Sequence, residues 1–143
     1  DAFSFRTYAQ RIVVGEETIA QVASLLDEWQ AERAMLVCGP SIRRDSDVID
    51  RVRAALQTRV VAEFTEVQPH VPAETVEAAM AIAARGHPDV LVSVGGGSTH
   101  DTSKAIAMLL ADGGRIHDQE GRSEAERRPR RPILAISTTM GGA

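Results

Sequence analysis

Residues 90–104 of this chain read Val-Leu-Val-Ser-Val-Gly-Gly-Gly-Ser-Thr-His-Asp-Thr-Ser-Lys. The apolar run before the glycines is typical of a parallel strand that is covered on both faces. Gly95, Gly96 and Gly97 lack the Cβ atoms that would keep a ligand away from the backbone. A helix is expected directly after them, so its first N–H groups and its positive dipole end would converge on this turn. The stretch therefore predicts a site for a phosphate or pyrophosphate group.

The expected helix begins with a capping signal. Ser98 is a residue type preferred at helix N-caps, and Asp101 stands three residues later, so we expect the two to form a capping box. The glycine pattern is neither G-x-G-x-x-G nor the P-loop, so neither standard nucleotide fingerprint applies. A glycine-rich turn that binds no ligand is the alternative interpretation.

Apolar runs and helical periodicities alternate along the whole chain. This alternation predicts parallel strands joined by right-handed crossovers. The expected fold is α/β, a Rossmann-like open, mostly parallel sheet with helices on both faces, and its ligand would lie beyond the carboxyl ends of the strands. We expect strands over 11–15, 34–38, 60–64, 89–94 and 133–136, the first of them paired as a hairpin with Phe3 and Phe5. We expect helices over 17–31, from Asp45 or Ser46 to Leu56, from Pro72 or Ala73 to Arg85, and from Ser98 to about Leu110.

Composition narrows the classes of function. The 143 residues suit one domain. The net charge of −4, and the lack of a stripe of basic residues interleaved with aromatic ones, argue against nucleic acid as the partner. A small molecule is the expected partner. Cys38 is the only cysteine and lies in an apolar run, which indicates a buried side chain rather than a disulfide. No apolar stretch has the length of a membrane span and no cationic leader is present, so we expect no membrane partner and a cytoplasmic location.

Two parts of the chain fall outside the alternating pattern. Residues 112–132 are polar and arginine-rich, so we expect a mobile surface excursion with solvated charges, although its arginines could also meet a phosphate. The last expected strand is followed by only a few residues, where an α/β unit would send out its next helix. We therefore expect the chain to be the first domain of a longer protein.

Four motifs stand in order along the chain. They are Val13-Val14-Gly15; Val67-Gln68-Pro69-His70-Val71-Pro72; Val94-Gly95-Gly96-Gly97-Ser98 with Asp101 and Lys104-Ala105-Ile106-Ala107; and Ile136-Ser137-Thr138-Thr139. Together they resemble the iron-containing (group III) alcohol dehydrogenase family, which includes maleylacetate reductases and glycerol dehydrogenases. The resemblance covers the whole chain.

This resemblance implies a two-domain enzyme. Residues 1–143 would form the domain that binds NAD or NADP, and an all-helical C-terminal domain beyond residue 143 would complete the catalytic cleft. In the family that second domain supplies an aspartate and three histidines that hold the metal, Fe(II) or Zn, so we expect no catalytic residue and no metal ligand in this chain. The full-length protein would be a homodimer acting on a small alcohol or carbonyl substrate. The chain's own histidines show no ligand spacing: His70, His87, His100 and His117.

Several residues acquire roles through the resemblance. Gly96, Gly97 and Ser98 would form the pyrophosphate cradle, and Gly95 before them would also belong to the cofactor site. Asp101 would orient that loop or meet the nicotinamide half. Thr138 and Thr139 would contact the cofactor from the neighbouring strand end, although two β-branched residues also suit the end of any strand. His70 stands where many members have asparagine, and is either a lid residue beside the nicotinamide or an ordinary loop residue.

Gly39 departs from the family's pattern. Many NAD-preferring members have an aspartate after this strand, whose carboxylate accepts hydrogen bonds from the ribose hydroxyls and repels a 2′-phosphate. Glycine at this position predicts relaxed discrimination between NAD and NADP, with Ser41, Arg43 and Arg44 near enough in sequence to meet a 2′-phosphate. The alternative is that Gly39-Pro40 is simply a turn that ends the strand.

The branch and the class of function stay open. Met140-Gly141-Gly142-Ala143 and His70-Val71-Pro72 are closer to maleylacetate reductases, whereas the long segment 112–132 is commoner among alcohol dehydrogenases. Our leading hypothesis is a metal-dependent, NAD(P)-linked oxidoreductase. The alternatives are a stand-alone nucleotide-binding module without catalysis, and a relative of the glycerol-1-phosphate dehydrogenases or sugar-phosphate cyclases.

Overall fold

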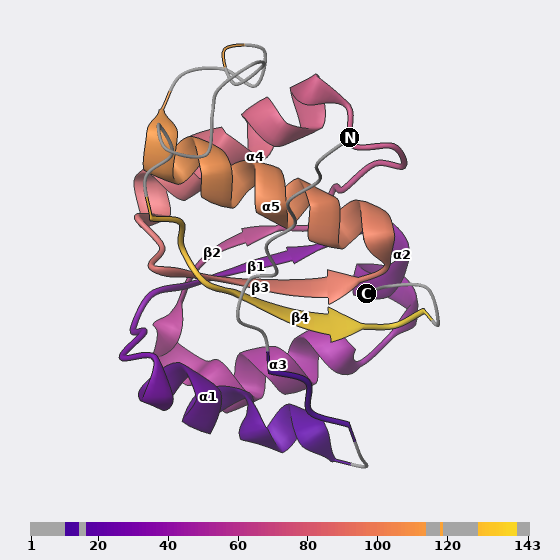
Figure 1. Ribbon diagram of the computed structural model, residues 1–143. Coiled ribbons are helices and arrows are strands. Elements are labelled where there is room, and N and C mark those ends of the chain that lie inside the picture. Colours follow the sequence, from indigo (N-terminus) through magenta and orange to yellow (C-terminus); the bar gives the residue numbers. More distant parts are fainter. Residues whose placement is uncertain (1–10, 15–16, 114–117, 119–128, 140–143) are drawn as a thin grey trace, which may run out of the picture.

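A four-stranded parallel sheet forms the centre of the molecule, in the strand order β2-β1-β3-β4 (Figure 1). The computed structural model describes residues 11–14, 17–113, 118 and 129–139. The expected α/β fold with a parallel sheet is confirmed. The strands are β1 (Ala34–Cys38), β2 (Val60–Phe64), β3 (Val90–Gly95) and β4 (Ile133–Ser137).

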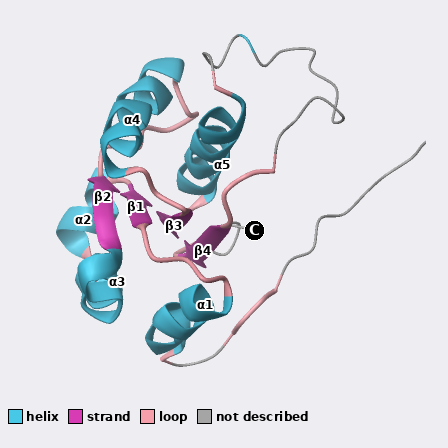
Figure 2. Cartoon of the chain, turned by 90° about the vertical axis from the view of Figure 1, so that its left-hand side faces the viewer, coloured by secondary structure: helices cyan, strands magenta, loops and turns pink. Residues whose placement is uncertain are grey.

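Helices cover both faces of this sheet (Figure 2), and the main ones form two pairs that pack on opposite faces. Leu36 and Cys38 of β1 pack in the core beneath the first pair of helices, and Met35 and Val37 pack beneath the second. Successive side chains of a strand point to opposite faces, so burial on both sides explains the uninterrupted apolar run of β1. The first pair is α1 (Val22–Glu28) and α3 (Val48–Leu56); the second is α4 (Ala73–Gly86) and α5 (Gly97–Asp112).

The connections change direction between β1 and β3. From β1 the chain passes through α3 to β2 at one edge, and from β2 it returns through α4 to β3, on the other side of β1. The chain then continues through α5 to β4. A reversal of this kind leaves a crevice at the carboxyl ends of the two central strands, where open α/β sheets bind their ligands.

A short helix that the sequence did not predict follows β1. Gly39-Pro40, for which a simple turn was the alternative interpretation, leads directly into α2 (Pro40–Asp45), with Pro40 in its first turn. A proline suits that position because the first N–H groups of a helix have no partner within the helix. The expected helix over 17–31 is also shorter, and consists of a 3₁₀ turn, η1 (Thr18–Gln21), followed by α1. Another 3₁₀ turn, η2 (Gln57–Arg59), precedes β2.

The expected strand over 11–15 is wrong for its described part. Residues 11–14 form no strand, and the side chains of Ile12 and Val14 are 74% and 88% exposed. No described strand lies beside them to pair with their backbone, so their β-branched composition alone does not produce a strand. Phe3, Phe5 and Gly15 lie outside the described residues.

Most of the expected excursion over 112–132 also lies outside the described residues, including Arg127 and Arg128. Arg131 belongs to the described part, and its guanidinium donates a hydrogen bond to the carbonyl of Pro88 at 3.2 Å. This arginine thus contacts the backbone that leads into β3. Among the described helices, none is long and apolar enough to cross a membrane.

The amino edge of the sheet is closed by hydrogen bonds between two loops. The Asp89 carboxylate accepts the N–H groups of Glu32 and Arg33, each at 3.0 Å. The Arg33 guanidinium donates to the carbonyls of Gly86 at 2.6 Å and His87 at 3.1 Å, which belong to the end of α4. Basic side chains at a helix C-terminus satisfy carbonyls that lack partners within the helix. The loops at the amino ends of the strands are therefore held together by hydrogen bonds within the chain.

Gly86 is required by a close approach between α4 and β2. A Cβ at this position would lie 2.9 Å from the Cβ of Ala62 and 3.1 Å from the carbonyl oxygen of Val61. The second neighbour is backbone of an edge strand, so an added methyl group can be accommodated only if α4 or β2 moves.

We expect Gly86→Ala to lower the free energy of unfolding by about 1–3 kcal/mol, because of this overpacking. Chemical denaturation of both proteins measures the difference. Gly97→Ala is the matched control, since a Cβ there has no atom within 4 Å. Equal stability of Gly86→Ala and the wild type would show that helix and strand are not in contact at this point.

Candidate functional site

A cleft of about 330 Å³ opens at the carboxyl edge of the sheet, in the size range of small-molecule sites. It lies where the chain leaves each of the four strands, and α2 and α5 both begin beside it. The residues that line it are Gly39, Pro40, Ser41 and Ile42 after β1; Val67, Gln68 and Pro69 after β2; Gly96, Ser98 and Thr99 after β3; and Thr138 and Thr139 after β4.

The turn from β3 into α5 depends on Gly95. Its φ of 155° lies in a region that side-chain-bearing residues rarely adopt. A Cβ at Gly95 would also lie 2.4 Å from the hydroxyl oxygen of Thr99, which is buried in the first turn of α5. Glycine is therefore required here by backbone conformation and by packing together.

Gly96 brings the tail of β4 against the glycine loop. A Cβ at Gly96 would lie 3.1 Å from Thr139 Oγ1 and 3.2 Å from Thr139 Cγ2. The backbone N–H of Thr138 donates to the carbonyl of Gly95 at 2.9 Å, which continues the pairing of Gly95 with Ser137 in the sheet. The two threonines therefore form one wall of the cleft, directly beside the loop.

The predicted capping box is wrong. The N-cap of α5 is Gly96, in an extended conformation, and its carbonyl accepts the N–H groups of Thr99 at 3.0 Å and His100 at 3.1 Å. The N-cap thus lies two residues earlier than expected, which places Ser98 inside the first turn. Asp101 instead forms an exposed ion pair with Lys104 at 3.0 Å.

The beginning of α5 suits an anion. It has no side-chain cap and no acidic residue in its first turn. The first N–H groups of a helix lack partners within the helix, and the positive end of the helix dipole adds to their field. Gly96 and Ser98 of this turn line the cleft, so the residues present fit a pyrophosphate group.

The β1 side of the cleft is open around Gly39. This residue has an ordinary φ of −86°, and a Cβ built on it would have one neighbour, the carbonyl oxygen of Val67 at 3.6 Å. Arg43 and Arg44 do not line the cleft. Arg44 is paired with Asp45 at 2.8 Å, and Arg43 lies 3.6 Å from Asp50.

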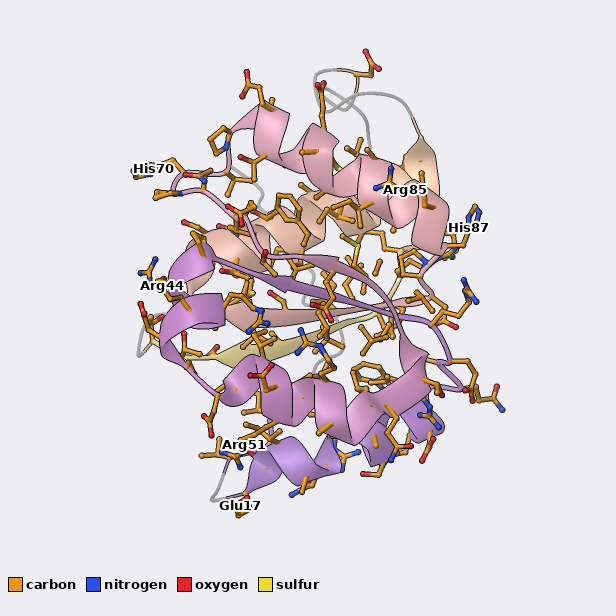
Figure 3. The ribbon with its side chains drawn as sticks, turned by 180° about the vertical axis from the view of Figure 1, so that it is seen from behind. Glu17, Arg44, Arg51, His70, Arg85 and His87 are labelled. Carbon is orange, nitrogen blue, oxygen red and sulfur yellow. The ribbon has the colours of Figure 1, made fainter. Side chains whose placement is uncertain are left out.

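The structure gathers most of the predicted binding residues around one cavity. Gly39, Ser41, Gly96, Ser98, Thr138 and Thr139 line the cleft. Gly95 and Gly97 flank it in the same loop. Asp101 and His70 do not line it, and Figure 3 shows His70 on the outside of the molecule, pointing away from the ribbon. Roles for these two residues remain predictions.

Sequence reasoning missed the apolar and backbone part of the lining. Val67, Gln68 and Pro69 line the cleft, although His70 was the residue selected from their motif. The N–H of Val67 donates to the carbonyl of Cys38 at 3.3 Å, so the segment after β2 continues alongside β1 towards the cleft. The signal was the motif itself, since a segment that follows a parallel strand lies at the ligand edge. The other missed residues are Pro40, Ile42 and Thr99.

His100 forms a buried polar contact beside the cleft. Its Nδ1 lies 2.8 Å from Ser93 Oγ and its Nε2 lies 3.2 Å from Ser137 Oγ. His100 is only 5% exposed. Burial lowers the pKa of His100 below its ordinary value, the charge of Lys104 lowers it further, and Asp101 acts in the opposite direction. The imidazole is therefore neutral at pH 7.

Among the described residues, the cysteine is not a reactive thiol and no group of side chains could hold a metal ion. Cys38 is buried, and burial raises the pKa of its thiol to about 11, so the nucleophilic thiolate is scarce at neutral pH. Within the described ranges, no group of three or more His, Cys, Asp or Glu side chains is arranged to hold a metal ion.

Comparison with known proteins identifies the family. Residues 9–143 match the family model for iron-containing alcohol dehydrogenases. The chain belongs to the iron-containing alcohol dehydrogenase family. The resemblance found in the sequence motifs is thus confirmed over nearly the whole chain.

Members of the iron-containing alcohol dehydrogenase family align with this chain over part of their length. The NAD-dependent methanol dehydrogenase of Bacillus methanolicus is 36% identical over 133 residues, 90% of this chain and 34% of that protein. The maleylacetate reductase of Burkholderia cepacia is 32% identical over 143 residues, which are 100% of this chain and 34% of that protein. The crystal structure of the sulfoacetaldehyde reductase of Bifidobacterium kashiwanohense in complex with NAD+ superposes with a TM-score of 0.78 at 26% identity. The match covers 97% of this chain and 37% of that chain. The chain therefore spans about a third of the length of the curated relatives that it matches.

The lowered pKa of His100 predicts a pH dependence of stability. Below its ordinary pKa of about 6.5, the unfolded chain binds a proton at this histidine that the folded protein resists, so stability falls as the pH drops from 7 towards 5. His100→Gln removes this titration. We therefore expect the stability advantage of the wild type over His100→Gln to shrink as the pH falls.

Denaturation curves at several pH values measure this difference. The curves are recorded for the wild type and for His100→Gln side by side. A pH-independent difference for His100→Gln would contradict the burial of a neutral imidazole.

Proposed function

We propose that this chain is the cofactor-binding region of an NAD- or NADP-dependent oxidoreductase that acts on a small alcohol or the corresponding carbonyl compound. The observation that carries the proposal is the cleft at the carboxyl edge of the sheet, with the uncapped beginning of α5 and its glycine loop in the wall. The names of two relatives support it, because one is an NAD-dependent methanol dehydrogenase and the other is a reductase solved with NAD+.

We assign the parts of the cofactor to the walls of the cleft. The pyrophosphate would rest on Gly96 and Ser98 at the start of α5, with Gly95 and Gly97 shaping the loop. Thr138 and Thr139 would contact it from the end of β4.

On the other side of the cleft, Gly39 and Ser41 at the end of β1 would face the ribose that carries the 2′-hydroxyl or 2′-phosphate. When bound, NAD(P) would supply the hydride acceptor or donor for the reaction. The residues of this chain would bind and orient it. Asp101 would orient the glycine loop or meet the nicotinamide half, and His70 would lie beside the nicotinamide.

The metal implied by the family does not fit the described residues. They contain no group of His, Cys, Asp or Glu side chains that could hold iron or zinc, so we derive no catalytic step through a metal from this chain. We propose that residues outside this chain, in an all-helical domain, hold Fe(II) or Zn and complete the substrate site. Residues 1–143 would then be the nucleotide domain of a larger, homodimeric protein.

The glycine loop provides a direct test of the proposed site. In the complete gene product we expect Gly96→Val to raise the Kd for NADH at least about tenfold, because its side chain would occupy the space between the loop and Thr139. Fluorescence titration with NADH and NADPH measures this. Gly96→Ala should give an intermediate loss.

Gly86→Ala is the control for this experiment. It crowds β2 at the amino edge of the sheet, so it should lower stability and leave the Kd unchanged. If Gly96→Val folds and binds the cofactor as tightly as the wild type, the loop has only an architectural role.

Gly39 leads to a prediction about the choice of cofactor. We expect the complete protein to use both cofactors, with kcat/KM values within roughly a hundredfold of each other. Gly39→Asp has room for its Cβ and should shift the ratio towards NAD by about tenfold or more, because the carboxylate repels a 2′-phosphate.

Gly39→Asn is the matched control, since it has the same size without the charge and should shift the ratio much less. Initial rates with both cofactors at fixed ionic strength give the ratios. A wild type that already prefers NAD a thousandfold, or an unmoved ratio in Gly39→Asp, would mean that residue 39 does not face the ribose.

A further inference from the structure

His100 joins two strands through both nitrogens of its ring. Ser93 lies in the middle of β3 and is completely buried, so the 2.8 Å contact between its Oγ and His100 Nδ1 is anchored in the core. Ser137 is the last residue of β4 and is exposed, and its Oγ lies 3.2 Å from His100 Nε2. The imidazole therefore connects a fixed point of the core to the end of an edge strand.

The end of this edge strand leads directly into the cleft. Thr138 and Thr139 follow Ser137, and both line the cleft. Among the described strands, β4 pairs only with β3. Contacts between described residues hold its tail to the glycine loop and to the start of α5: the N–H of Thr138 donates to the carbonyl of Gly95, Thr139 packs against Gly96, and the side chain of Ser137 contacts His100.

We propose that His100 is a positioning residue, which holds the tail of β4 against the glycine loop through Ser137 and thereby sets the affinity of the cleft for its ligand. The inference rests on the proposed function, because it takes NAD(P) as that ligand. His100 does not line the cleft itself, so it would act through the placement of Thr138 and Thr139.

The chemistry of the imidazole suits this role. A neutral ring has one donor and one acceptor nitrogen, and a serine hydroxyl can serve either, so both contacts are satisfied without a charge in the core. The charged groups that face His100 are Lys104 and Asp101, which are paired with each other. Burial and the charge of Lys104 favour the neutral ring by lowering its pKa, whereas Asp101 and a hydrogen bond with the backbone of Gly95 act in the opposite direction.

Two amide substitutions separate the two ring contacts. The amide of asparagine can take the place of Nδ1 and keep the contact with Ser93, whereas the amide of glutamine can reach the place of Nε2 and keep the contact with Ser137. We expect His100→Asn and Ser137→Ala each to raise the Kd for NADH about fivefold in the complete gene product, the size of one lost hydrogen bond. His100→Gln should recover most of the affinity.

A double-variant cycle distinguishes positioning from general stability. Because both changes remove the same contact, His100→Asn combined with Ser137→Ala should bind NADH no more weakly than either alone. Should His100→Asn fail to fold, Ser137→Ala at the exposed strand end still decides the question, with an unfolding midpoint close to that of the wild type.

The outcomes separate this inference from the proposed function. Unchanged NADH affinity in Ser137→Ala and His100→Asn, or additive losses in the double variant, would overturn the positioning role while leaving the cofactor site in place. A wild-type protein that binds neither NADH nor NADPH in the same titration would overturn the proposed function, and the inference about His100 with it.

Discussion

The conformation of the backbone between β3 and α5 determines the geometry of the candidate site. Gly95 holds a φ of 155°, with Thr99 where a Cβ would lie, and this turn aims the first N–H groups of α5 at the carboxyl edge of the sheet. Gly96, the next residue of this turn, has no side chain, so the residues that follow β4 can approach its backbone. The proposed anion site at the start of the helix and the threonine wall of the cleft therefore follow from one glycine-dependent turn.

The two edges of the sheet serve different purposes. At the amino edge, Arg33 and Asp89 satisfy loop N–H groups and the carbonyls of α4 with partners from within the chain. At the carboxyl edge, the uncapped helix start and the bare loop face a cleft. Hydrogen bonds that are completed internally stabilise the fold, whereas helix N–H groups beside a cavity are available to a ligand. This contrast is the physical basis for placing the cofactor at the carboxyl edge.

The central sheet and the glycine loop were predictable from the sequence, because buried parallel strands and a strand-glycine-helix turn leave strong local signals. The remainder depended on contacts between distant residues. Pro40 reads as a turn until a helix is seen to start there, and the apolar residues 11–14 read as a strand although no described strand pairs with them. Ser98 suits an N-cap by type, but the extended backbone of Gly96 takes that place. The tie from His100 to Ser93 and Ser137 joins three elements, and no local pattern reveals it.

The most direct test is a crystal structure of the complete protein with bound NAD+ or NADP+. The account predicts pyrophosphate oxygens within about 2.7–3.2 Å of backbone N–H groups at the start of α5, beside Gly96 and Ser98. Thr138 and Thr139 would lie against the cofactor in the same structure. A cofactor whose pyrophosphate lies away from this loop would contradict the central claim that the turn after β3 forms the cofactor site.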